Sequence, residues 1–275
     1  MVERNIKSVK TVHHKQQSPT HKVGLIIEPG NWVEYDPFLI LAEDWFQKGT
    51  FDLHPHRGIE TVTYVIEGRL EHFDNKAGKG ELLPGDVQWM TAGSGVIHSE
   101  DPAEGETVHS LQLWVNLPAN KKMTEPRYQN MKASDMPVFE KEGALLRIFS
   151  GSSNGVTSPT LNHTPVTFVE MNLEAGVDVR QELPGNYNGF LYVLEGQGTF
   201  GSDHTEGRAG QVLFLENVES DEGSFITVRA DQQLKVLLYA GQPIKEQVVA
   251  RGPFVMNTEE EVRQAYKDYM DGKFV

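Results

Sequence analysis

The sequence predicts an all-β protein built from two similar barrel-like units and closed by one short helix. Many short segments rich in Val, Leu, Thr and aromatic residues are separated by clusters of Gly, Asn, Asp and Pro. Numerous short strands at regular spacing favour a sandwich or a barrel. The strands that we expect most clearly span residues 21–27, 60–68, 111–117, 166–173, 189–200 and 233–241.

An internal repeat indicates the two units. The segment TYVIEGRLEHF at 63–73 is similar to LYVLEGQGTFG at 191–201, and PGDVQWM at 84–90 is similar to AGQVLFL at 209–215. In both copies a strand leads into a Glu-Gly turn, a hairpin and a second glycine turn, which predicts two copies of one β unit. The polar, proline-flanked stretch at 116–137 is the expected connection. The resulting domains are residues 1–132 and 133–275.

One helix is expected near the C-terminus, in the segment NTEEEVRQAYKDYMDGKF. Thr258 and Glu261 have the spacing of a capping box. Val262, Tyr266 and Tyr269 lie on one face, and Gly272 ends the pattern. The glutamates of the first turn suit the positive end of the helix dipole. The pattern therefore predicts a docking or capping helix.

Composition excludes several classes of function. The chain has 275 residues, a net charge of −14 and no cysteine. Disulfides, thiolate metal sites and cysteine nucleophiles are therefore excluded. The negative charge argues against direct binding of nucleic acid and against anionic membranes. The N-terminus has no apolar signal-peptide core, and no segment has the length of a membrane helix, so a cytoplasmic protein is expected.

Two histidines flank a proline at the start of one predicted strand, in FDLHPHRGIETVTYVIEGRL. Residues i and i+2 of a strand point to the same face, so His54 and His56 project together. Two neutral imidazoles placed side by side can bind one metal ion. Pro55 faces the other way, is tolerated at the start or edge of a strand, and stiffens the segment. A His-x-His pair is weak evidence for a metal site when it stands alone.

A second pair strengthens the metal hypothesis, in PGDVQWMTAGSGVIHSEDP. His98 and Glu100 are again i and i+2, so they share a face if the segment is extended. Two pairs on two strands could converge on one ion inside a barrel. Three imidazoles and one carboxylate would leave open positions on an octahedral metal, as in the related ligand sets of non-haem iron oxygenases.

These motifs resemble the two cupin motifs. A His-x-His-x₃-Glu pattern followed by a glycine is formed by His54, His56, Glu60 and Gly68, and a Pro-Gly-Asp turn and a later histidine follow it. More narrowly, HPHRGIETVTYVIEG, GDVQWMTAGSGVIHSE, LQLWVNLP and GPFVMNT are similar to the pirin family. The similarity runs from about residue 54 to the C-terminal end, and DPFL at 36–39 extends it towards the start.

The resemblance implies a bicupin, in which two double-stranded β-helix barrels lie face to face and the N-terminal barrel holds one metal. Its metal ligands fall on His54, His56, His98 and Glu100, and Glu100 is also the expected catalytic group. Glu60 is expected to support the site without binding the metal. The metal is expected to be Fe(II), although such a ligand set also accepts Mn, Co, Ni, Cu or Zn.

The second copy lacks this ligand set. An alignment of the two copies places Glu182 opposite His54 and Pro184 opposite His56, and the stretch at 219–225 opposite His98 has no histidine. The C-terminal barrel is therefore expected to support the first barrel or to offer a docking surface. Surface or structural roles are expected for the remaining histidines of the first copy, His13, His14, His21, His72 and His109.

For function, the resemblance leaves three alternatives. Several bacterial pirin-like proteins are quercetin 2,3-dioxygenases, which open a flavonol ring with O₂ and release carbon monoxide. A small phenolic substrate and O₂ would then be the partners. Animal pirins resemble iron-dependent regulators that bind transcription factors, which would make this chain a metal-gated protein-binding module. The third alternative is another metal-dependent cupin enzyme, such as an isomerase. Family members are often monomers, and a monomer is expected here.

Overall fold

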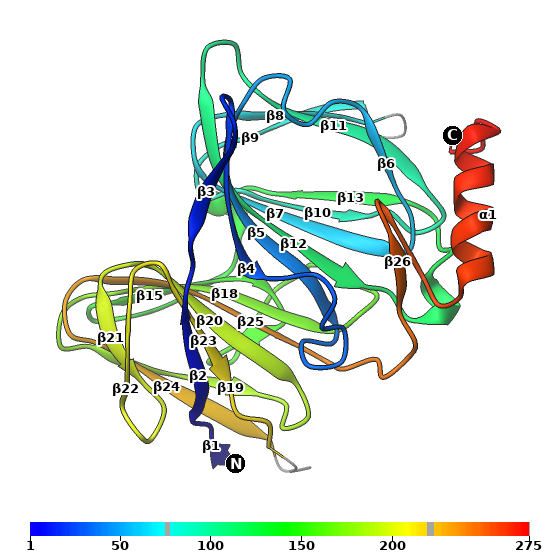
Figure 1. Ribbon diagram of the computed structural model, residues 1–275. Helices are drawn as coiled ribbons and strands as arrows, with labels where there is room; N and C mark the ends of the chain where they lie inside the picture. The colour runs from blue at the N-terminus through cyan, green and yellow to red at the C-terminus, as the bar shows by residue number, and fades with distance from the viewer. Residues whose placement is uncertain (75–77, 219–222, 275) are drawn as a thin grey trace. The chain divides into compact units, whose positions relative to one another are not determined.

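The structure is a computed structural model that describes residues 1–74, 78–218 and 223–274 (Figure 1). The described residues are mostly β-strands, with one α-helix, α1 (Glu259–Met270). They divide into two compact units. The N-terminal barrel comprises His13–Ser134 and Ile244–Val275, and the C-terminal barrel comprises Met1–Val12 and Asp135–Pro243. The all-β class, the two units and the short helix are therefore confirmed.

The N-terminal barrel consists of two larger sheets and one small hairpin. One sheet has the strand order β13 (Arg127–Met131), β10 (Val87–Thr91), β7 (Ile59–Glu67), β12 (Thr107–Asn116), β5 (Phe38–Gln47), β4 (His21–Ile27) and β3 (His14–Ser18). The other has the order β6 (His54–His56), β11 (Val96–Pro102), β8 (Leu70–Asp74) and β9 (Gly78–Leu82). The hairpin is formed by β26 (Val249–Arg251) and β27 (Phe254–Met256).

The N-terminal barrel buries many polar side chains. In β11 the side chains alternate, so that His98 and Glu100 are buried while Ser99 between them is half-buried. The adjacent strand β8, which pairs with β11, also buries polar side chains, at His72 and Asp74. Polar groups are seldom buried without partners, because removing them from water costs free energy. The many buried polar side chains of the N-terminal barrel therefore indicate a functional site.

The C-terminal barrel has the same plan. One sheet has the order β14 (Val138–Lys141), β15 (Ala144–Ser150), β18 (Val166–Leu173), β25 (Leu234–Gly241), β20 (Asn188–Glu195), β23 (Gln211–Leu215) and β2 (Ile6–Thr11). The other contains β1 (Val2–Glu3), β24 (Ser224–Ala230), β21 (Gln197–Phe200) and β22 (Thr205–Arg208), with β19 (Asp178–Leu183) also on β24. A two-stranded hairpin is formed by β16 (Ser152–Ser153) and β17 (Val156–Thr157). Its core is an apolar cluster drawn from both larger sheets, which includes Leu191, Phe200 and Ile226.

The terminal segments do not follow the contiguous division at residues 132 and 133. The N-terminal strand β2 pairs with β23 of the C-terminal barrel, and Arg4 just before it is buried there. The last segment, Ile244–Val275, belongs instead to the N-terminal barrel. The domain limits must therefore be corrected at both ends. Strand pairing assigns the N-terminus to the C-terminal barrel, and contacts with Arg57 and Gly58 assign the last segment to the N-terminal barrel.

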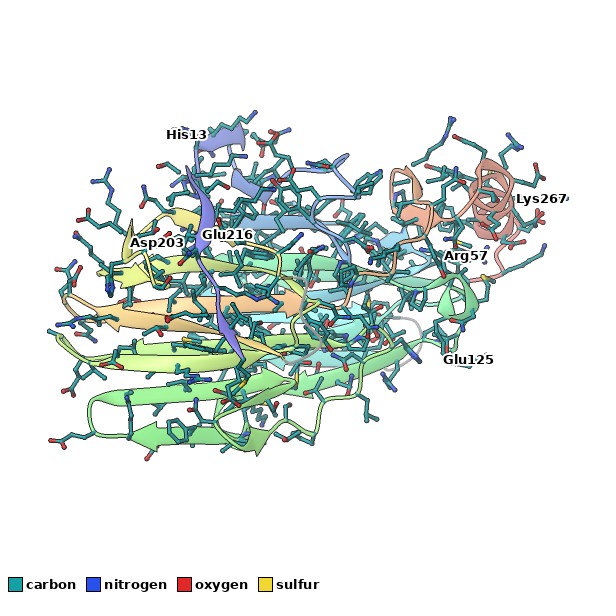
Figure 2. All side chains as sticks on the ribbon, turned by 90° about the horizontal axis from the view of Figure 1, so that it is seen from below. His13, Arg57, Glu125, Asp203, Glu216 and Lys267 are labelled. Carbon is teal, nitrogen blue, oxygen red and sulfur yellow. The ribbon has the colours of Figure 1, made fainter. Side chains whose placement is uncertain are left out.

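The C-terminal helix has the predicted cap. The Thr258 hydroxyl accepts a hydrogen bond from the Glu261 backbone N–H at 3.2 Å, and the Glu261 carboxylate accepts one from the Thr258 N–H at 2.9 Å. Of the three residues expected on one face, Val262 is buried, whereas Tyr266 and Tyr269 stay exposed at its edge and pack their rings against Phe254. Figure 2 labels Arg57 beside this helix, on which Lys267 lies.

Candidate metal centre

Three histidines meet inside the N-terminal barrel. His54 and His56 lie on β6 and His98 on β11, and one ring nitrogen from each lies within 4.8 Å of the others. The pairing of the two strands causes this, since His98 is the direct partner of His54 and Val96 that of His56. The three rings have centroid separations of 4.4–5.1 Å. Two of the predicted ligands thus come from one strand and the third from its neighbour.

Pro55 fits this arrangement because β6 is the edge strand of its sheet. An edge strand needs backbone donors on one side only, so a residue without an N–H removes no ladder bond. Pro55 stands opposite Ile97 in the pairing, and its ring restricts the backbone between the two histidines. The short strand therefore presents two imidazoles from a stiff segment.

The pKa values of His56 and His98 favour the neutral rings that can bind a metal ion. Burial lowers the pKa of His98 well below its usual value, and the nearby His54 and His72 contribute. Burial likewise lowers the pKa of His56, with His98 and His54 adding to the effect; the nearby Pro253 carbonyl, which lies outside hydrogen-bond geometry, opposes it. These two rings are therefore neutral at pH 7, which is the form that binds metal ions.

The hydrogen bonds of the site also fit a metal ion. Neither ring nitrogen of His56 or of His98 has a hydrogen-bond partner, although both rings are buried. Such atoms are rare in folded proteins, and each needs an explanation such as a bound ion. In His54 the Nδ1–H donates to the Asp52 carbonyl at 2.7 Å, which leaves Nε2 with its lone pair. A hydrogen bond from the other ring nitrogen to a carbonyl orients metal-binding histidines in this way.

Glu100 lies in the same barrel but outside the three-histidine group. Its two carboxylate oxygens accept hydrogen bonds from the Thr63 hydroxyl at 3.1 Å and from the Gln112 amide at 2.7 Å. It is buried, on the same face of β11 as His98. Its role as the fourth ligand therefore stays a prediction. Glu60 is also buried and accepts a hydrogen bond from Thr91 at 2.7 Å.

A cavity of about 170 Å³ adjoins the histidines. His54 and Glu100 line it, together with apolar side chains such as Trp114, whose ring packs edge-on against His56 at 5.0 Å. Its complete lining is His21, Ile40, Ala42, Asp44, Phe46, Phe51, His54, Thr63, Leu70, Glu100, Ser110, Gln112 and Trp114. An apolar cavity with a few convergent polar groups is typical of a small-molecule site.

Sequence reasoning missed several of these residues. His21 was expected to have a surface or structural role, but it lines the cavity and is hydrogen-bonded to Asp44 at 2.7 Å. Burial raises the pKa of the Asp44 carboxyl, and the hydrogen bond from His21 opposes this. Ile40, Ala42 and Asp44 alternate along β5, so the two-residue period that identified the histidines could have marked them.

The strand pairing corrects the correspondence between the two copies. Two residues after each Glu-Gly turn, Leu70 pairs with Pro102 and Gly198 pairs with Ala230. Counting back four residues matches His98 with Ile226. Since Ile226 pairs with Gln181, the residue that corresponds to His54 is Gln181 and not Glu182.

The same pairing assigns the other positions of the C-terminal barrel. Leu183, the partner of Ser224, corresponds to His56, and Val228 corresponds to Glu100. The C-terminal barrel thus has one amide and three aliphatic side chains where the N-terminal barrel has its candidate ligands. Residues 219–222 of the stretch aligned with His98 lie outside the described residues.

The chain is similar to known proteins over most of its length. Residues 28–115 match the family model described as Pirin, and residues 168–275 match the Pirin C-terminal cupin domain. A pirin-like protein from Solanum lycopersicum is 45% identical over 240 residues, which cover 86% of this chain and 81% of that protein. This chain belongs to the pirin family. Human pirin is a more distant relative, 36% identical over 250 residues, which cover 86% of this chain and 82% of that protein.

Two solved structures support the bicupin fold of this pirin-family chain. A protein from Geobacillus kaustophilus is 62% identical, with a TM-score of 0.89 and coverage of 90% of this chain and 99% of that one. A quercetin 2,3-dioxygenase from Acinetobacter baumannii is 30% identical, with a TM-score of 0.85 and coverage of 98% of both chains. The bicupin expectation is confirmed. Among the described residues, no helix is long and apolar enough to cross a membrane.

Proposed function

We propose that this protein is a metal-dependent dioxygenase that opens the ring of a small phenolic substrate, of which flavonols such as quercetin are the model. The observation that carries the proposal is the three-histidine cluster, with two buried, unpartnered imidazoles, beside a cavity that also contains a carboxylate. The similarity to the Acinetobacter baumannii dioxygenase over nearly the whole chain supports the reaction class.

His54, His56 and His98 would hold the metal, and Glu100 is the proposed fourth ligand. A bound divalent metal, for which we propose Fe(II), would supply Lewis acidity towards a phenol and redox chemistry with O₂. Nitrogen and oxygen ligands also suit Mn, Co, Ni, Cu and Zn.

Glu100 would accept the proton of the substrate hydroxyl. Its carboxylate is held by donors from two other strands, Thr63 on β7 and Gln112 on β12. A base fixed in this way needs little reorganisation when a proton arrives. The apolar wall, which includes Ile40 and Trp114, would orient the ring and exclude water. The cavity is smaller than the roughly 300–1,000 Å³ of drug-sized pockets, so it would enclose one ring system of the substrate.

Oxygen consumption tests the proposal. Protein loaded anaerobically with Fe(II) is given quercetin and O₂, with His98→Ala as the inactive variant and His13→Ala, an exposed histidine, as the matched control. Uptake by the wild type and by His13→Ala, but not by His98→Ala, is expected. If the metal is bound and no O₂ is consumed, the dioxygenase is ruled out for this substrate, and the metal-gated protein-binding module becomes the better account.

A further inference from the structure

The cavity has a polar group that the proposed chemistry does not use. His21 and Asp44 line it together with His54 and Glu100. His21 begins β4 and Asp44 lies on the adjacent strand β5, so the two side chains meet across neighbouring strands. The His21 Nε2–H donates to the Asp44 carboxylate at 2.7 Å. Phe51 packs edge-on against the His21 ring at 5.2 Å and restricts its orientation.

This pair offers acceptors to the cavity. A carboxylate has two oxygens, and the bond from His21 occupies only Oδ1 of Asp44. Ser110, on the adjacent strand β12, is the direct partner of Asp44, and it also lines the cavity. A hydroxyl group of a ligand is the natural donor for such a set.

The carboxyl groups of Asp44 and Glu100 lie close enough for their charges to interact. The Glu100 charge contributes to the raised pKa of Asp44, so the two carboxyl groups lie within electrostatic reach inside one cavity. The described lining contains these two acidic side chains and no lysine or arginine. An anionic group on the ligand would be repelled here, whereas a neutral hydroxyl is accepted.

We propose that His21 and Asp44 form a second recognition point for the substrate, which accepts a hydrogen bond from a ring hydroxyl other than the one that Glu100 deprotonates. The site therefore selects phenols with at least two hydroxyl groups over phenols with one. This inference rests on the proposed function, because it takes a phenolic ligand as the occupant of the cavity.

Binding to Zn(II)-loaded protein tests this separately from turnover, because zinc has no redox chemistry. The two probes are quercetin and 3-hydroxyflavone, which keeps the 3-hydroxyl and lacks the others. We expect the wild type and the His13→Ala control to bind quercetin about tenfold more tightly. In Asp44→Ala the ratio of the two dissociation constants should fall towards one, while the affinity for 3-hydroxyflavone is kept. In Asp44→Asn and His21→Gln, which conserve shape, the ratio should be intermediate.

Three results would overturn the inference: an unchanged ratio in Asp44→Ala, an equal loss of both affinities in all three variants, or a wild type that does not distinguish the two probes. A different result would contradict the dioxygenase proposal. If Zn(II)-loaded protein shows the hydroxyl preference but Fe(II)-loaded protein consumes no O₂, the recognition point stands and the reaction does not.

Discussion

His56 and His98 are buried residues whose ring nitrogens have no protein partner. Leaving such a group unsatisfied costs roughly 1–3 kcal/mol of stability, so the metal-free protein carries this cost. Selection for stability alone would favour aliphatic residues, as at Leu183 and Ile226 in the other barrel. The histidines are therefore best explained by a ligand that binds them.

We predict that His56→Ala and His98→Ala each lose most of the bound metal and also its stabilising effect. Metal at about 100 times its dissociation constant should stabilise the wild type by about 2.7 kcal/mol. Neither variant should gain stability from the same addition, because one of the three histidine ligands is missing. Metal content and thermal unfolding with and without metal measure this. Stoichiometric metal in both variants would contradict the assignment.

Gln112 provides a second prediction for single residues. Its amide donates to the Glu100 carboxylate, and its side-chain oxygen accepts a hydrogen bond from the Trp114 ring at 3.2 Å. Gln112→Ala should lower kcat about tenfold while metal content stays at the wild-type level, since side chains that hold a site carboxylate by a hydrogen bond typically contribute this much. Steady-state kinetics together with metal analysis decide the matter. Loss of metal in this variant would show that Glu100 depends on Gln112 for ligation.

Among the elements, the C-terminal segment supports the strand that carries two of the histidines. Directly after His56, Arg57 donates to the Ser94 carbonyl at 2.7 Å and forms an ion pair with Asp268 of α1 at 2.9 Å. Gly58 has φ of 81°, and a Cβ there would lie 1.9 Å from the Val255 carbonyl oxygen of β27. The hairpin and helix thus fix the end of β6 by close contact.

The ion pair predicts a pH-dependent contribution to stability. Hydrogen bonds from Arg57 and Lys273 hold the pKa of Asp268 well below its usual range. A carboxyl with a lowered folded-state pKa stabilises the protein above its unfolded pKa of about 3.9, and this stabilisation is lost as the pH falls below that value. Asp268→Asn should therefore cost about 1.5 kcal/mol at pH 7, the lower end of the range for hydrogen bonds to charged groups, because Asp268 is only half-buried. The difference from wild type should shrink below pH 4.

Urea unfolding of wild type and Asp268→Asn at pH 7, 5 and 3 measures this difference. Glu260→Gln on the same helix is the control, because its pair with Arg263 is exposed and should give no measurable change. A destabilisation by Asp268→Asn that is as large at pH 3 as at pH 7 would contradict the linkage.

Lys122 connects the same segment to the barrel. Its buried Nζ donates to the Gly58 and Val255 carbonyls and to Asn116 Oδ1, at 2.7–2.9 Å. Lys122→Met should destabilise the protein by about 2–4 kcal/mol, because buried acceptors lose their donor. Lys121→Met, at the exposed neighbour, should have little effect. Equal unfolding midpoints for the two variants would argue against this role.

At the scale of the whole molecule, two barrels of one plan have different interiors. The C-terminal barrel is filled by an apolar cluster, and its counterparts of the candidate ligands are Gln181, Leu183, Ile226 and Val228. It is completed by the N-terminal segment, where Arg4 donates to Ser224 Oγ and to three backbone carbonyls. The chain therefore begins in the barrel that its second half forms.

Arg4→Met should destabilise the C-terminal barrel selectively. The substitution leaves buried acceptors without their donor, at a cost of about 2–4 kcal/mol. Hydrogen exchange should accelerate in β23 and β24, while metal binding by the N-terminal barrel persists. Arg208→Met, at an exposed position of the same barrel, is the matched control. Faster exchange in β6 and β11 but not in β24 would contradict this assignment of the N-terminus.

The sequence by itself determined the all-β class, the repeated unit, the capped helix and the histidines that the structure brings together. These features depend on local spacing: alternate residues of a strand share a face, and a capping box spans four residues. Tertiary structure decided the rest. His21, Asp44 and Gln112 reach the cavity from separate strands, the termini complete barrels distant in the sequence, and Gln181 replaces Glu182 as the counterpart of His54. The physical reason is that strand pairing is set by packing between distant segments, and a one-residue change of register reverses which side chains face the interior.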